Sequence, residues 1–298
     1  MSLALLIPGG TGQLGRELVS RAPSDAVVVA PGSAELNLTQ PRDVLAAVDS
    51  LVSAASSAGL PAAVINPAAY TKVDDAETDA TRAYAVNADG PRLLAAACSS
   101  RGVPLVHVST DYVFAGDADA PYEVDSPVAP RSVYGVTKAA GEAAVLASPG
   151  SAWVVRTSWV YGAHGHNFVR TMVRLASGTD SVSVVDDQCG VPTWTAELAD
   201  GLLELASRAA AGAGPAQRLL HCTAAGETTW FGLARAVFEE VGADPSRVGP
   251  CRTADHPRPA ARPAYSVLSP ASWLAAGLPP RRHWREALTA AFATHSFR

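Results

Sequence analysis

A tyrosine and a lysine four residues apart are the side chains in this sequence best suited to chemistry. Tyr134 and Lys138 lie in a segment with a helical pattern, so they should share one face of a helix. A carbonyl group that accepts a hydride also needs a proton, and a phenol with a pKa of about 10 is a poor donor at neutral pH. An adjacent ammonium group stabilises the phenolate and lowers that pKa. The pair suits carbonyl reduction, although an exposed helix often carries such a pair by chance.

Polar residues at the end of a predicted strand strengthen this interpretation. Ser109, Thr110 and Asp111 directly follow the strand predicted at residues 105–108. The carboxyl end of a parallel strand is where ligands bind in sheets of this type. Thr110 could hydrogen-bond a substrate carbonyl or the tyrosine hydroxyl, whereas the alternative for Thr110 and Asp111 is a turn cap. We therefore predict Thr110, Tyr134 and Lys138 as the catalytic residues.

A glycine-rich loop near the start of the chain predicts a dinucleotide site. Gly9, Gly12 and Gly15 follow an apolar strand and precede a helix, where free N–H groups and the helix dipole favour a pyrophosphate. The alternative is a strand–helix turn that binds nothing. After the second strand, residues 30–35 contain Ser33, but no arginine and no acid directly after the strand. The missing acid removes the block against a 2′-phosphate, and Ser33 could donate to that group, whereas no arginine is present to hold it. We therefore favour NADPH and leave NADH possible.

Apolar runs alternate with helical patterns over the first 160 residues, which predicts a doubly wound parallel α/β sheet of the Rossmann type. The expected strands are residues 2–7, 27–30, 62–66, 104–108 and 151–156, and the expected helices are 14–21, 80–101 and 134–146. Thr39 is expected to cap a further helix that begins near Pro41. We predict an NAD(P)-binding domain over residues 1–160, completed by parts of 196–222, and a smaller substrate domain over 161–298.

Composition narrows the classes of partner. The 298 residues are 48% hydrophobic and carry a net charge of −5, which argues against a nucleic-acid-binding surface. The four cysteines show no C-x-x-C pairing, so a zinc or redox motif is not expected. The first residues do not fit a signal peptide, and no apolar stretch is long enough to span a membrane. We expect a cytoplasmic protein with no membrane partner.

Six segments in order along the chain carry a family resemblance. They are residues 9–15, 64–77, 107–116, 133–142, 156–161 and 186–193. Ser-Thr-Asp-Tyr-Val-Phe at 109–114 and Arg-Thr-Ser-Trp-Val-Tyr at 156–161 are its most specific motifs. The sequence resembles the dTDP-4-dehydrorhamnose reductase family, within the extended short-chain dehydrogenase/reductase superfamily.

This resemblance implies the reduction of dTDP-4-dehydro-L-rhamnose to dTDP-L-rhamnose by hydride transfer from NAD(P)H. It implies Tyr134 as proton donor, Lys138 as its activator and ribose anchor, and Thr110 as the hydroxyl that tunes the donor. The implied cofactor-binding residues are Gly9, Gly12, Gln13, Leu14, Asn37, Leu38, Ala68, Ala69, Tyr70 and Lys138. The implied substrate-binding residues are Thr110, Asp111, Trp159, Asn167 and Arg262.

Some positions depart from the family pattern. Asn37 stands where the family usually has aspartate, which puts adenine recognition there in doubt. Some members carry magnesium on glutamates at a dimer contact; Glu17 matches the first of these, but Glu197 would need a shift of one residue. We therefore predict no metal site, and the protein could be a monomer or a homodimer.

Two alternative functions stay open. A 4-ketoreductase for another dTDP-deoxysugar would keep the same catalytic residues. A non-catalytic partner-binding protein, similar to the regulatory subunit of methionine adenosyltransferase, would belong to the same superfamily. For single residues, Trp159 could fill the core, and Arg262 could be a solvated loop residue.

Overall fold

Six parallel strands form the central sheet of the computed structural model, which describes residues 2–294 and Phe297. The strands are β1 (Ala4–Leu6), β2 (Val27–Val29), β3 (Ala62–Asn66), β4 (Leu105–Thr110), β5 (Ala152–Thr157) and β10 (Leu219–His221). Their order is β10-β5-β4-β3-β1-β2, and each neighbouring pair is parallel. The chain adds β2 on one side of β1 and β3 on the other, so the order reverses between β1 and β3. This is the predicted doubly wound arrangement.

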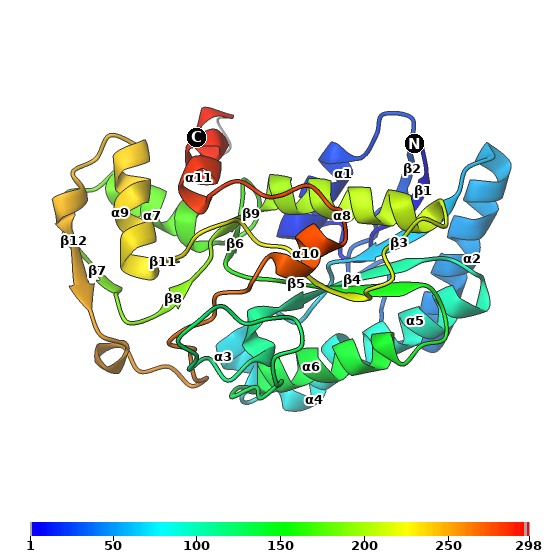
Figure 1. Cartoon of the computed structure of the whole chain (residues 1–298), viewed down its shortest axis with the longest axis horizontal. Helices are drawn as coiled ribbons and strands as arrows, with labels where there is room; N and C mark the ends of the chain where they lie inside the picture. The colour runs from blue at the N-terminus through cyan, green and yellow to red at the C-terminus, as the bar shows by residue number, and fades with distance from the viewer. Residues whose placement is uncertain (1, 295–296, 298) are drawn as a thin grey trace.

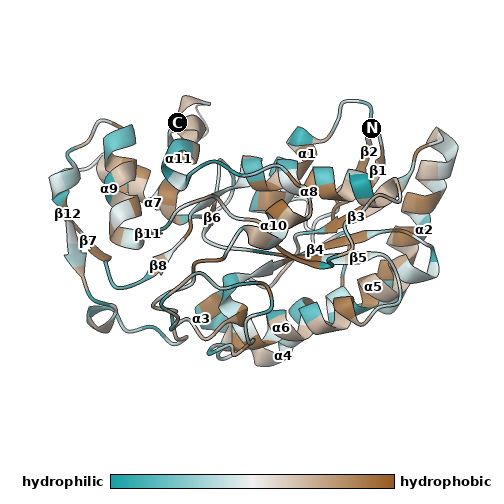
Figure 2. Cartoon of the chain, in the orientation of Figure 1, coloured by the Kyte–Doolittle hydropathy of each residue, from teal (hydrophilic) through white to brown (hydrophobic). Residues whose placement is uncertain are grey.

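Helices cover both faces of the sheet (Figure 1). The helices α1 (Gln13–Arg21) and α8 (Thr195–Ala210) lie on one face, and α2 (Pro41–Ala58), α5 (Gly90–Ser100) and α6 (Val133–Leu146) lie on the other. Leu5 packs into the core on the α1 and α8 side, and Leu6 packs into the core on the other side. The strands are apolar without alternation because both of their faces are covered, and Figure 2 shows hydrophobic residues along β4 and β5.

A second hydrophobic core lies at one end of the sheet, around α7, α9 and α11 (Figure 1). Its elements are α7 (Phe168–Ala176), α9 (Trp230–Glu240), α11 (Trp284–Ala293) and the pairs β7 (Val182–Val185) with β12 (Val248–Cys251), β6 (Val160–Tyr161) with β9 (Thr193–Trp194), and β8 (Cys189–Gly190) with β11 (Thr228–Thr229). The domain boundary at residue 160 stays a prediction. No helix in the described part of the chain is long and apolar enough to cross a membrane.

One local prediction is confirmed with a refinement, and one is wrong. The segment predicted as helical over 80–101 is helical without a break over residues 80–100, but it consists of α4 (Ala80–Tyr84), a π-helical turn (Ala85–Asp89) and α5. The π-helical turn contains Asn87, which is fully buried and whose side chain bonds outside the helix. The error concerns Thr39: α2 begins at Pro41 with Gln40 at its N-cap, and the Thr39 hydroxyl donates instead to Asn37. Short helices α3 (Val73–Ala76) and α10 (Ala271–Ala275) complete the fold.

Candidate active site

The glycine loop lies where the strand order reverses. Gly9 has a φ of +77°, and a Cβ there would be 3.0 Å from the Cβ of Ala68 in the loop after β3. A Cβ on Gly15 would be 2.2 Å from the Gly9 carbonyl oxygen. These two glycines therefore allow close packing of the loop. Gly12 is the N-cap of α1, and a Cβ there would meet only the Gly9 carbonyl oxygen, at 3.1 Å. The helix start next to it fits a pyrophosphate.

The two residues after Gly12 have different surroundings. Gln13 donates to the Val160 carbonyl at 3.0 Å and accepts from Asn167 Nδ2 at 3.1 Å. Leu14 is buried in the core beneath the loop. Asn167 also caps α7 by accepting the Arg170 N–H at 3.0 Å. Gln13 and Asn167, predicted for different ligands, are thus brought into contact with each other.

The predicted cofactor-groove residues Ala68, Ala69 and Tyr70 lie in the loop after β3. The Ala68 N–H donates to Asn66 Oδ1 at 3.2 Å. Both backbone groups of Tyr70 bond the Asn87 amide, at 2.7 and 3.1 Å, and Asn87 Nδ2 also donates to Thr137 Oγ1 at 3.1 Å. Asn87 thus holds the loop against α6, and Asn66 fixes the start of the loop at the end of β3. The sequence carries no signal for them, because a lone amide in an apolar segment fits an ordinary strand or helix.

The loop after β2 carries the residues predicted for the adenosine half. Asn37 Oδ1 accepts from the N–H and the hydroxyl of Thr39, at 3.1 and 2.8 Å. Leu38 is buried. Glu35 bonds the Gly32 N–H at 2.8 Å, so this acid closes its own loop.

An arginine from α1 approaches this loop. Arg16 Nε donates to the Thr11 carbonyl at 3.0 Å, and the Thr11 hydroxyl packs so closely on Gly32 that a Cβ there would be 2.9 Å away. Arg16 is exposed, as is Ser33, the residue after Gly32. Although residues 30–35 contain no arginine, Arg16 thus supplies a cation beside Thr11, which packs on the loop after β2. The sequence missed Arg16 because the residue belongs to another element.

Thr110 and Tyr134 meet at the carboxyl end of the sheet. Thr110 is the last residue of β4 and is paired with Thr157 at the end of β5. Its hydroxyl lies beside the Tyr134 phenol, and Tyr112 packs edge-on against the phenol ring, with centroids 5.5 Å apart. Burial raises the pKa of Tyr134 to about 12, the neighbouring Thr110 hydroxyl opposes the rise, and Asp111 adds to it. The phenol is therefore protonated at neutral pH.

Lys138 lies one helical turn after Tyr134 and is 2% exposed. Its Nζ donates to the Val108 carbonyl at 2.7 Å and lies 3.4 Å from His107 Nε2. Burial lowers the pKa of Lys138 to about 8, although Glu142 on the next turn opposes the change. A lysine whose charge changes close to neutral pH can hold a ribose hydroxyl or influence a phenol.

Several buried oxygens surround Thr110. Asp111 Oδ1 accepts from Thr110 Oγ1 at 2.9 Å. Asp111 Oδ2 and the hydroxyls of Ser109, Thr157 and Ser266 have no hydrogen-bond partner among the described residues. Burial raises the pKa of Asp111 to about 6, while the nearby hydroxyls of Ser266 and Thr110 oppose that rise. Because unpaired buried polar groups are costly, this arrangement fits a ligand rich in hydroxyl groups.

Trp159 follows the end of β5 and is the one described non-glycine residue with a positive φ, +45°. Its ring stacks on Trp230 of α9, with centroids 3.6 Å apart and planes 6° apart, and Phe168 also contacts Trp230. Gly190 lies against the indole edge. Trp159 is half-buried, so part of its surface can still contact a ligand.

Arg262, which the sequence predicts to bind the substrate, is already paired within the protein. Its guanidinium donates to Asp74 at 2.8 Å and to the Ala260 carbonyl at 3.0 Å. Burial would raise the pKa of Asp74, but its bonds with Arg262 and the Ala260 N–H outweigh burial and lower it. The pair connects the C-terminal segment to α3.

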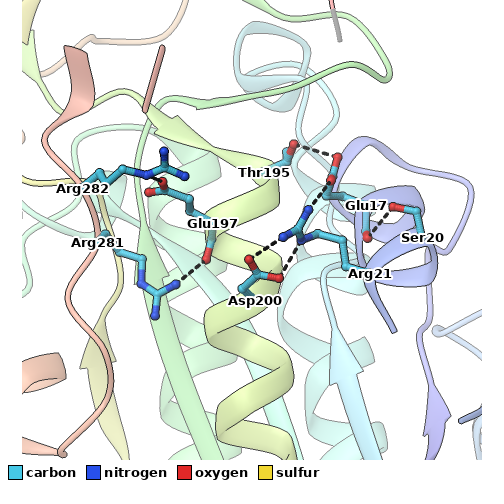
Figure 3. Close-up of polar contacts among 8 residues, drawn as sticks. All are labelled: Glu17, Ser20, Arg21, Thr195, Glu197, Asp200, Arg281 and Arg282. Atoms are coloured by element: carbon cyan, nitrogen blue, oxygen red, sulfur yellow. Dashed lines mark hydrogen bonds and ion pairs between the residues drawn. The ribbon is translucent and has the colours of Figure 1, made fainter. Parts of the chain in front are cut away.

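The glutamates considered for magnesium are bonded to protein groups (Figure 3). Glu17 accepts from the Thr195 hydroxyl at 3.2 Å and lies 3.9 Å from Arg21, which forms two bonds of 2.6 Å with Asp200. Glu197 is ion-paired with Arg282. No cluster of three histidine, cysteine or acidic residues suitable for a metal occurs within residues 2–294 or at Phe297. Within the described chain, both glutamates are therefore already bonded to protein groups.

Known proteins similar to this chain agree with the geometry. Residues 3–297 match the family described as RmlD substrate binding domain. The chain is 49% identical to a dTDP-4-dehydrorhamnose reductase of Streptomyces griseus, over 96% of this chain and 92% of that protein. It is also 49% identical to a probable dTDP-4,6-dihydroxy-2-methyloxan-3-one 4-ketoreductase of Streptomyces antibioticus, over 96% and 94% of the two chains.

A solved structure extends the similarity to three dimensions. The structure of dTDP-4-dehydrorhamnose reductase from Bacillus anthracis in complex with NADP superposes with a TM-score of 0.88 at 32% identity. The match covers 99% of this chain and 100% of that one. The similarity therefore includes both the central sheet and the second core.

Proposed function

Because this chain belongs to the RmlD substrate-binding family, we propose that it reduces dTDP-4-dehydro-L-rhamnose to dTDP-L-rhamnose with a nicotinamide cofactor. The observation that carries the proposal is the meeting of Thr110, Tyr134 and Asp111 at the end of β4, beside the buried Lys138. A bound NADPH would supply the hydride.

In this proposal Tyr134 gives its proton to the oxygen of the reduced carbonyl. Thr110, whose hydroxyl lies beside the phenol, would orient it by a hydrogen bond. Lys138 stabilises the phenolate that is left and anchors the nicotinamide ribose. The unpaired oxygen of Asp111 and the half-buried Trp159 supply a polar and an apolar contact for the sugar nucleotide.

The glycine loop, together with the loops after β2 and β3, would hold the cofactor. Gly9 and Gly12, with the backbone of Gln13 and Leu14, would face the pyrophosphate, and Asn37 and Leu38 the adenine. Ala68, Ala69 and Tyr70 would line the groove. We favour NADPH because exposed Arg16 and Ser33 lie near the end of β2, where a 2′-phosphate would bind.

A second candidate is a 4-ketoreductase for another dTDP-deoxysugar. The observation that favours it is the equal identity, 49%, to the two Streptomyces relatives. Both candidates need the same proton donor, so the side chains that contact the sugar would decide between them.

A product assay separates the candidates. The protein would be incubated with dTDP-4-dehydro-L-rhamnose and, separately, with other dTDP-4-keto-6-deoxy sugars, each with NADPH and NADH in parallel. We expect dTDP-L-rhamnose and a preference for NADPH. Turnover of another keto sugar alone would favour the second candidate. No turnover of any would favour the non-catalytic alternative.

A further inference from the structure

A buried histidine connects β3 to the lysine of the candidate active site. His107 lies in β4, three residues before Thr110, and is 0% exposed. Its Nδ1 is 3.1 Å from Asn66 Nδ2 at the end of β3, and its Nε2 is 3.4 Å from Lys138 Nζ on α6. The roles proposed above for Lys138 and Tyr134 make no use of Asn66 or His107.

The hydrogen bonds around Asn66 fix which nitrogen of His107 carries the proton. Asn66 Oδ1 accepts the Ala68 N–H at 3.2 Å, so the amide NH₂ group must point toward the imidazole. The opposite orientation of the amide would place NH₂ against the Ala68 N–H, two donors face to face. Nδ1 of His107 therefore accepts a hydrogen bond, and the proton of the neutral ring is on Nε2.

The Nε2–H group then faces Lys138. An amine nitrogen has a lone pair that can accept from Nε2–H, whereas an ammonium ion presents a second donor to it. Burial and the neighbouring Lys138 lower the pKa of His107 well below its usual value, so the ring is neutral at physiological pH. Two groups favour the charged lysine instead: the Val108 carbonyl of β4, at 2.7 Å, and Glu142 of α6.

Glu142 cannot exert its full charge on Lys138. Its two oxygens form bonds of 2.8 and 2.7 Å with Arg156 of β5, and both side chains of this pair are buried. Tyr134, one turn before Lys138 on α6, is neutral at this pH. The protonation state of Lys138 thus depends mainly on two groups. The Val108 carbonyl favours the ammonium ion, and the tautomer of His107 decides whether its Nε2 opposes or supports that charge.

We propose that Asn66 and His107 are positioning residues for Lys138: Asn66 fixes His107 as its Nε2–H tautomer, and this tautomer favours the neutral amine of Lys138 over the ammonium ion. The tautomer is a property of the folded chain. Its effect on turnover rests on the proposed function, in which Lys138 assists Tyr134. Loss of the lysine proton would then set the alkaline limb of the pH profile.

The tautomer can be read without any activity. In protein labelled with ¹⁵N-histidine, long-range ¹H–¹⁵N spectra distinguish a protonated from an unprotonated ring nitrogen, and His107→Phe assigns the signal. We expect unprotonated Nδ1 and protonated Nε2 in the wild-type protein. A proton on Nδ1 would overturn the proposal, whatever the substrate of the enzyme proves to be.

Asn66→Asp reverses the chain of hydrogen bonds. A carboxylate can accept both the Ala68 N–H and a proton on Nδ1, which leaves the Nε2 lone pair facing Lys138. The His107 spectrum should switch, and the alkaline limb of kcat/KM should move up by about one pH unit. An unmoved limb in an active enzyme contradicts the proposal.

The control is Asn66→Asp combined with His107→Phe. It keeps the new carboxylate but removes the imidazole, so the limb should return toward that of His107→Phe alone. A shift that persists in the double variant would mean that the new carboxylate attracts the Lys138 ammonium directly, without the tautomer, and would also overturn the proposal.

Discussion

The protonated Tyr134 phenol gives the most direct test at the scale of single residues. We expect Tyr134→Phe to lower kcat by about 10²–10⁴-fold, because it removes the proton donor and little else. Dissociation constants for NADPH, measured by fluorescence titration, should stay within a few-fold of wild type.

The matched control is Tyr84→Phe on α4, where the tyrosine is 41% exposed. Its kinetics should equal those of the wild type. Full activity in Tyr134→Phe would remove Tyr134 from the proposed mechanism, and equal losses in both variants would indicate a general effect of the substitution.

Gly190 controls the position of Trp159. A Cβ on Gly190 would lie 2.4 Å from Cε2 of the indole, so Gly190→Ala must displace the Trp159 ring. The positive φ of the Trp159 backbone already costs about 1–3 kcal/mol. If Trp159 contacts the sugar nucleotide, KM for that substrate should rise about tenfold, while KM for NADPH changes little.

Gly249→Ala in β12 is the control, because a Cβ there meets nothing within 4 Å. It should leave both KM values unchanged. A changed near-ultraviolet circular dichroism spectrum would show that the indole has moved in Gly190→Ala. If KM for the sugar nucleotide is then unchanged, Trp159 only fills space.

Arg16 should decide the choice between the two nicotinamide cofactors. Removing its guanidinium in Arg16→Ala takes away the cation near the end of β2, so KM for NADPH should rise about tenfold while KM for NADH stays the same. Arg92→Ala on α5, an exposed arginine paired with Asp89, serves as control. Equal changes for both cofactors would place Arg16 away from the 2′-phosphate.

At the scale of elements, a buried ion pair connects α6 to β5. Glu142 and Arg156 have side chains 5% and 2% exposed. Glu142→Gln leaves the arginine charge buried without its partner, which should lower the free energy of unfolding by about 3–5 kcal/mol. Urea denaturation followed by circular dichroism would measure this loss.

Glu204→Gln on α8 is the matched control. Glu204 pairs with Arg208 within the same helix, and their side chains are 44% and 34% exposed. The expected loss is below about 1 kcal/mol. Similar losses in the two variants would mean that burial does not set the strength of the α6–β5 pair.

Most elements could be predicted from the sequence because apolar runs and glycine punctuation are local signals. The π-helical turn at Asn87 could not, because its cause is the set of bonds between Asn87 and two distant segments, the loop at Tyr70 and α6 at Thr137. The same limit applies to the candidate site. The spacing of Tyr134 and Lys138 is visible in the sequence, whereas the packing of Thr11 on Gly32, and the approach of His107 to Asn66, exist only after folding.

At the scale of the whole molecule, paired charges connect α1, α8 and the C-terminal segment (Figure 3). Three acids, Glu17, Glu197 and Asp200, face Arg21 and Arg282, and Arg281 donates to the Glu197 carbonyl at 2.9 Å. Acids already bonded to guanidinium or hydroxyl groups have little affinity left for magnesium, which prefers several oxygen ligands and retained water.

We therefore expect activity that does not depend on divalent cations. After dialysis against EDTA, kcat/KM and the melting temperature should equal those of the untreated protein, and added Mg²⁺ should change neither. Loss of activity on chelation, restored by Mg²⁺, would contradict this expectation. Arg282→Ala adds a sharper comparison: it frees the Glu197 carboxylate from its ion pair, so any stabilisation by Mg²⁺ should arise in this variant and not in the wild type.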